Sequence, residues 1–166
     1  MNKYEDVDIC IILKEYLNYH YKYSQKYGEK TIVLMLVGQF YEIYAVINDE
    51  INVGADLNVI SDILNIQISR LNKTIKEISY DNFLMAWFPD HAFLKSRNML
   101  LNHNYTIVKV DQTTAPPNPE REVTEIISPS TIIDTCNNSD TNNLFSMYIN
   151  SIPQKNKSMI TVGLST

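Results

Sequence analysis

The sequence predicts an α/β fold, in which a mixed β-sheet is flanked by helices and is followed by the first hairpin of a second domain. Apolar and aromatic residues near the N-terminus recur at three- and four-residue spacings, which is typical of a helix that buries one face. Residues 31–37 (TIVLMLV) are continuously apolar and rich in β-branched side chains, as in a buried central strand. Helical and strand patterns then alternate along the chain, which favours an α/β domain.

The first predicted elements are a helix and a long strand. The helix covers about residues 4–27, and Gly28 supplies its C-terminal stop. The strand begins at residue 31 and is expected to run on through residue 44, because the apolar character continues.

The rest of the predicted domain alternates between short helices and strands. In chain order these are a helix over residues 55–64, strands over 66–71 and 83–88, a helix from 89 to about 104, and strands over 105–110 and 122–128. The helix after Pro89 is expected to present Ala92, Phe93, Met99 and Leu100 to the core. A loop that holds three of the six prolines separates the last two strands.

Composition divides the chain into two parts. Residues 134–143 are polar and contain no aliphatic side chain, so they are predicted to be a linker between a first domain over 1–133 and a second over 144–166. The second part holds strand patterns at 144–149 and 159–164. Two strands cannot bury a core by themselves, which indicates a truncated domain.

Charge and glycine content exclude several function classes. The 166 residues carry a net charge of −5, and the whole deficit lies in residues 1–133, which argues against a surface that grips nucleic acid by charge alone. The four glycines form neither a G-x-x-x-x-G-K-S/T loop nor a G-x-G-x-x-G loop, so an ATPase or nicotinamide enzyme of the usual kind is excluded within this chain. Two cysteines cannot form a disulfide framework or a four-cysteine zinc site.

Targeting signals are not recognisable in the sequence. The N-terminus is acidic and lacks a secretory pattern, and the longest apolar run is too short to span a bilayer. We therefore expect a soluble, intracellular protein with no membrane partner, whose compartment (viral, nuclear or organellar) stays open.

Two segments carry a specific resemblance to a known family. Residues 27–44 (YGEKTIVLMLVGQFYEIY) contain a G-x-F-Y-E-I-Y strand, and residues 85–92 (MAWFPDHA) are similar to an M-A-G-x-P-x-H-A turn. A strand that ends in Asp111-Gln112 and an exit at 121–131 (REVTEIISPST) follow in order. Over residues 5–131 the chain resembles the N-terminal mismatch-recognition domain of the MutS DNA mismatch repair family, closest to its branch in large DNA viruses and organelles.

The sequence departs from the family pattern at two positions. Trp87 stands where the family usually has glycine in the turn motif, and Ser130 replaces the glycine of the exit motif. Both positions concern local backbone geometry. Residues 162–166 look like a strand of the family's connector domain, which fits the truncated second part.

Phe40 and Glu42 are the main candidate site residues. They are two apart on a predicted strand, so they project from one face. A phenyl ring can enter the minor groove and unstack a base step, at lower cost where pairing is already weak. By resemblance, Phe40 stacks at mispaired bases and Glu42 contacts a base. From spacing alone, an aromatic residue near a strand end is more often part of a core.

The resemblance also implies the remaining site residues and partners. Arg70 and Lys73 could contact phosphate, although solvated surface charge is at least as common an explanation. Mismatched double-stranded DNA and the other MutS domains are the expected partners, and the full-length family forms homodimers. No catalysis and no cofactor are expected in this chain, because ATP and Mg²⁺ belong to an ATPase domain outside it.

Two alternatives stay open. Acidic residues at Glu42, Asp49, Glu50 and Asp56 could belong to a metal-dependent nuclease, although the chain has no D/E-x-K triplet. The domain could also be an interaction module without DNA binding.

Overall fold

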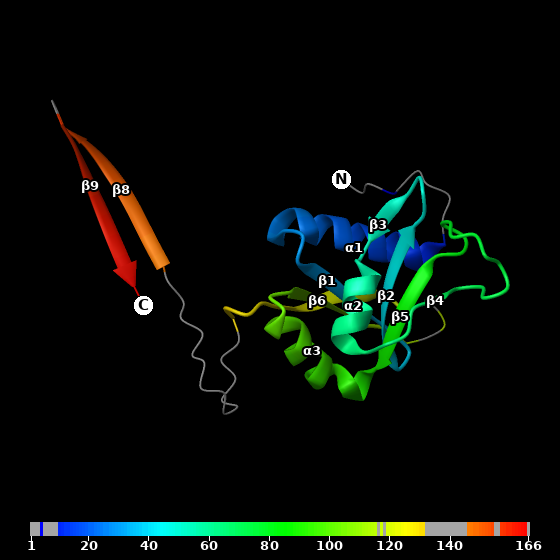
Figure 1. Cartoon of the computed structure of the whole chain (residues 1–166). Helices are drawn as coiled ribbons and strands as arrows, with labels where there is room; N and C mark the ends of the chain where they lie inside the picture. The colour runs from blue at the N-terminus through cyan, green and yellow to red at the C-terminus, as the bar shows by residue number, and fades with distance from the viewer. Residues whose placement is uncertain are drawn as a thin grey trace. The chain divides into compact units, whose positions relative to one another are not determined.

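A computed structural model describes residues 4, 10–115, 117, 119–131, 146–154 and 157–165. The chain divides into two units, Met1–Pro129 and Ser130–Thr166. The first unit contains a mixed sheet flanked by three α-helices, which confirms the predicted fold class, and the second contains a two-stranded sheet (Figure 1).

The elements of the first unit largely follow the predicted order. They are α1 (Ile11–Tyr27), β1 (Thr31–Val37), β2 (Phe40–Ile47), β3 (Asn52–Gly54), α2 (Leu57–Leu64), β4 (Ser69–Arg70), β5 (Leu84–Pro89), a 3-10 turn η1 (Asp90–Ala92), α3 (Phe93–Asn102), β6 (Thr106–Gln112) and β7 (Arg121–Ile127). The strand order is β4-β5-β2-β1-β6-β7, and β3 pairs with β2 outside this path. Only the β1–β6 pair is parallel among the described strands.

Helices cover both faces of the sheet. The Tyr44 ring of β2 packs edge-on against Tyr16 of α1, whereas the Tyr41 ring contacts Phe93 of α3. Side chains three apart on a strand point to opposite faces, so α1 and α3 lie on opposite sides of the sheet (Figure 1). Strand β1 runs between them, and its residues 32–35 are completely buried, as the apolar run predicts.

The prediction of one continuous strand through residue 44 is wrong. The chain turns at Gly38 and Gln39, and β2 returns antiparallel to β1 with Val37 opposite Phe40. Gly38 has a φ of 63°, and glycine at the first central position suits a two-residue hairpin turn. Because both strands are buried and apolar, hydrophobicity alone could not reveal this turn. The turn makes Phe40 the first residue of β2.

Two further boundaries differ from the prediction. Helix α1 starts at Ile11, while the described residues before it, Tyr4 and Cys10, lie outside the helix and the rest of 1–9 lies outside the described residues. The strand predicted over 66–71 is reduced to Ser69–Arg70 at the edge of the sheet. This strand lies at the edge of the sheet and, in the described part of the chain, pairs with β5 only, and short edge strands are common in proteins.

The buried face of α3 differs in part from the predicted one. Leu100 is fully buried as expected, but Ala92, Phe93 and Met99 are only half-buried, and Ser96 and Leu101 are buried beside Leu100. The segment Asp90–Ala92 is a 3-10 turn, which has about 3.0 residues per turn where an α-helix has about 3.6. The side chains before and after it therefore do not share the single face that a continuous α-helix would give them.

The second unit contains β8 (Ser146–Gln154) and β9 (Lys157–Ser165), which pair antiparallel. Both strands are longer than the sequence pattern predicts. The predicted linker, residues 134–143, lies outside the described residues.

Candidate nucleic-acid interface

Phe40 lies at the end of the sheet, directly after the Gly38–Gln39 turn. It pairs with Val37 of β1 on one side and Pro89 of β5 on the other. Its side chain is 38% exposed, whereas the following residue Tyr41 is buried on the opposite face. A large apolar ring is therefore accessible at the point where the strand begins.

A second exposed ring lies against Phe40. Trp87 of β5 is 48% exposed, and its ring centroid is 5.0 Å from that of Phe40, with the two planes at 74°. The pair has the edge-to-face geometry that aromatic quadrupoles favour. We call Phe40 and Trp87 the aromatic tip. In the sequence, Trp87 stands out only as a departure from a motif, since its contact with Phe40 depends on how β2 and β5 pair.

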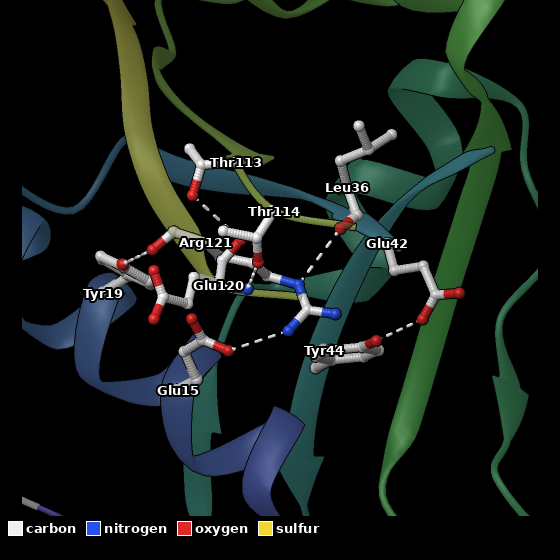
Figure 2. A network of polar contacts seen from close by, with 9 residues as sticks. All are labelled: Glu15, Tyr19, Leu36, Glu42, Tyr44, Thr113, Thr114, Glu120 and Arg121. Atoms are coloured by element: carbon white, nitrogen blue, oxygen red, sulfur yellow. Dashed lines mark hydrogen bonds and ion pairs between the residues drawn. The ribbon is translucent and has the colours of Figure 1, made fainter. Parts of the chain in front are cut away.

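Glu42 lies beside the aromatic tip on the same face of the sheet. It is directly opposite Trp87 in the β2–β5 register and is half-buried. Its carboxylate accepts a hydrogen bond from the hydroxyl of Tyr44, two residues later (Figure 2). The spacing of Phe40, Glu42 and Tyr44 was visible in the sequence, but the Tyr44 donor was not predicted.

The surroundings shift the pKa of Glu42 upward. Burial raises the pKa of this carboxyl, while the hydrogen bond from Tyr44 and the positive charge of Arg121 partly counteract that rise. The pKa of Tyr44 is raised by burial and by the nearby Glu42 charge, so the phenol stays protonated and remains a donor. The site thus holds a carboxyl group that is easier to protonate than an exposed one.

Arg121, the first residue of β7, connects this site to helix α1. Its Nη1 lies 3.2 Å from Oε2 of Glu15, and its Nε donates to the carbonyl of Leu36 at 3.3 Å (Figure 2). Its backbone carbonyl accepts a hydrogen bond from the hydroxyl of Tyr19 at 3.0 Å. The Arg121 side chain is 11% exposed, so it is part of an internal network and is poorly placed to grip phosphate.

The two predicted phosphate contacts lie away from the aromatic tip. Arg70 pairs with Leu84, five residues along β5 from Pro89, which is about 17 Å at about 3.3 Å per residue. Its Nη2 donates to the carbonyl of Lys73 at 3.3 Å, and its Nε is buried without an acceptor among the described residues. Lys73 is exposed. The structure brings Arg70 and Lys73 together but does not bring them to Phe40 and Glu42.

The acidic residues considered for a nuclease do not converge. Asp56 caps α2 by accepting from the backbone N–H of Val59 at 3.3 Å, and Asp49 and Glu50 lie in the turn after β2, at the opposite end from Glu42. In the part of the chain that the structure describes, no three His, Cys, Asp or Glu side chains are grouped to hold a metal ion. None of the described helices has the length and apolar character needed to cross a membrane.

Comparison with known proteins points to one family. A family model described as MutS domain I matches residues 17–136. A protein of Acanthamoeba polyphaga mimivirus that is described as a DNA mismatch repair mutS homologue is 32% identical over 147 residues. That match covers 87% of this chain and 13% of the mimivirus protein, so the chain spans a small part of the length of this relative.

Proposed function

Since this chain belongs to the MutS family and carries its domain I, we propose that it recognises mispaired bases in DNA by inserting Phe40 as a wedge while Glu42 contacts a base. The observation that carries the proposal is the accessible Phe40 ring at the end of the sheet with a half-buried carboxyl on the same face. Preferred substrates are duplexes with a mispaired or looped base.

The exposed ring suits a wedge because it needs no rearrangement to reach DNA. Phe40 directly follows the two-residue turn at Gly38 and Gln39, so only a short loop lies beside the ring at this end of the sheet. An apolar wedge in the minor groove unstacks one base step, which costs a few kcal/mol at an intact step and less at a mismatch. The difference in unstacking cost favours binding at the mismatch, and it does not depend on the base sequence.

Glu42 adds a second source of selectivity, which depends on hydrogen bonding and charge. A carboxylate accepts hydrogen bonds from base N–H groups and is repelled by phosphates, so it is tolerated only where a base edge is open. A protonated carboxyl can also donate to a base acceptor. Because burial raises the pKa of Glu42, the protonated form is easier to reach here than for an exposed carboxyl.

Charge indicates that most of the affinity comes from elsewhere. The net charge of this chain is −5, and Glu42 and the exposed Asp90 both lie near the aromatic tip. Arg70 and Lys73 are the proposed phosphate contacts, and two cations supply little of the salt-dependent affinity of a DNA-binding protein. We therefore propose that other MutS domains hold the duplex, form the homodimer and bind ATP and Mg²⁺, and that this chain itself catalyses nothing and needs no cofactor. Residues 144–166 are proposed to begin the connector domain after a linker over 134–143.

The test of this function is competition binding with Phe40→Ala. A labelled duplex with one mispair is displaced by unlabelled matched or mismatched duplex, and wild type is expected to prefer the mismatched one. Phe40→Ala is expected to lose that preference. Tyr27→Ala is a matched control, because Tyr27 has the same 38% exposure but is the last residue of α1, before the start of β1, whereas Phe40 follows the end of β1. Equal discrimination by Phe40→Ala and wild type contradicts the wedge.

The Glu42→Gln variant separates the wedge from the base contact. Glutamine keeps the shape but loses the charge, so mismatch binding is expected to persist with a changed order of preference among lesions. An identical order in both proteins contradicts a base contact by Glu42. If wild type, tested together with the MutS domains proposed to hold the duplex, binds DNA with no preference for a mispair, the interaction-module alternative replaces the proposed function.

A further inference from the structure

Trp87 is a large apolar side chain that the proposed wedge does not use. It lies on β5 directly opposite Glu42, and residues opposite one another in a sheet share a face. With 48% of its surface exposed, it is more accessible than Phe40 itself. It is also the only tryptophan in the chain.

The angle between the two rings limits where the Trp87 ring can lie when the Phe40 ring is inserted between base pairs. Their planes are 74° apart and their centroids are 5.0 Å apart. A ring that separates two base pairs lies parallel to them, so the indole is then steeply inclined to the bases. The indole cannot share the same gap, and its place is in the groove beside that gap.

The chemistry of the indole fits the minor groove. Its faces are apolar, as are the faces of the deoxyribose rings that line the groove, and Nε1–H is a donor without acceptor capacity. The minor groove presents acceptors at adenine N3 and thymine O2. A donor with an apolar body therefore matches both the walls and the floor of this groove.

We propose that Trp87 is a second DNA-contacting residue, which packs in the minor groove next to the step that Phe40 opens and holds the Phe40 ring in its inserting orientation. This inference rests on the proposed function, since it requires Phe40 to enter the base stack. The aromatic tip is then a two-ring wedge in which one ring separates bases and the other covers the adjoining groove.

Intrinsic fluorescence tests this contact directly because the 166-residue chain has a single tryptophan. The chain is titrated with a duplex that carries one mispair, and anisotropy of a dye on the DNA reports occupancy. At saturation, acrylamide quenching of Trp87 is expected to fall about twofold, since DNA then covers an indole that was half exposed. No tryptophan elsewhere in the chain can mimic the signal.

Two variants test the contribution of the ring to affinity. Trp87→Ala is expected to weaken binding of the mismatched duplex about tenfold, toward the lower end of the effect of aromatic contacts with nucleic acids. Trp87→Phe, which keeps a ring, is expected to lose less. Leu94→Ala removes an exposed apolar side chain from α3 and serves as the control, and thermal melting checks that each variant is folded.

The outcomes separate this inference from the proposed function. A protected Trp87 together with weaker binding by Trp87→Ala supports the two-ring wedge. Unchanged acrylamide quenching at saturation, in a wild-type chain that still prefers the mismatch, overturns the role of Trp87 and leaves the Phe40 wedge intact. A wild-type chain that shows no preference for the mismatch overturns both.

Discussion

The hydroxyl of Tyr44 donates a hydrogen bond to the carboxylate of Glu42, two residues earlier on the same face of β2. Tyr44 is itself fixed, because its buried ring packs edge-on against both Tyr16 and Phe83. The donor therefore approaches Glu42 from a rigid position. This arrangement orients the carboxyl group next to the aromatic tip and moderates its pKa.

Tyr44→Phe tests this relationship with little change in shape. Loss of the hydroxyl removes an interaction that lowers the pKa of Glu42, so that pKa is expected to rise further above its usual value. The protonated fraction of Glu42 at neutral pH then increases. NMR titration of the Glu42 carboxyl carbon checks the direction, with Tyr27→Phe as control. A pKa equal to or below the wild-type value contradicts the assigned role.

Arg121→Gln tests the network that connects β7 to α1. The substitution removes the ion pair with Glu15 and the hydrogen bond to the Leu36 carbonyl, leaving partly buried acceptors without this donor. We expect a loss of about 2 kcal/mol in the free energy of unfolding, below the usual 3–5 kcal/mol for a fully buried pair because Glu15 retains solvent access. Urea denaturation measures it.

A double-mutant cycle with Glu15→Gln separates the ion pair from the rest of that loss. If the pair contributes, the two substitutions together cost less than the sum of their separate effects. Strict additivity would show that the ion pair with Glu15 contributes nothing to stability and that the effect of Arg121 comes from its other contacts.

The buried imidazole of His20 is expected to make the protein less stable in mild acid. Burial lowers the pKa of its imidazole to about 4, below its ordinary value of 6.5. The unfolded chain therefore takes up the proton first as the pH falls. The stability that depends on a neutral His20 is fully present above pH 6.5 and is lost as the pH falls from 6.5 toward 4, by up to about 3 kcal/mol.

His20→Phe keeps a ring in contact with Tyr16, against which His20 stacks with centroids 6.1 Å apart, but it cannot titrate. Its free energy of unfolding, measured by urea denaturation at pH 7 and pH 5, is expected to change less between the two values than that of wild type. An equal change in both proteins assigns the acid sensitivity to other groups.

Lys73→Gln tests the proposed phosphate contact. Removal of one contact to phosphate weakens binding to matched and mismatched duplexes alike and reduces the slope of log K against log salt by about 0.9. The preference for the mismatch is expected to stay unchanged. Lys95→Gln, an exposed lysine on α3, is the control. If Lys73→Gln and Lys95→Gln give the wild-type slope, Lys73 is ordinary surface charge.

Much of the fold could be predicted because the evidence for it is local. The apolar run over residues 31–37 identified the central strand. The helical spacing near the N-terminus identified Leu13 and Tyr16 as buried residues of α1, but it missed Leu17 and wrongly included Tyr27, which is exposed. The turn at Gly38 could not be predicted by hydrophobicity, because the sequence is apolar on both sides of it. The same pattern fits one long strand or two antiparallel ones, and only pairing with β5 and β6 distinguishes them.

The sequence by itself determined that Phe40 and Glu42 share a face, since alternation along a strand depends only on backbone geometry. It also carried the motifs that indicate the family. Only the tertiary structure decided that Trp87 lies against Phe40 and that Arg121 reaches Glu15, 106 positions earlier in the chain. Such contacts depend on strand register and on how a helix packs against the sheet. Those are set by the combined burial of many distant residues, and no local pattern records them.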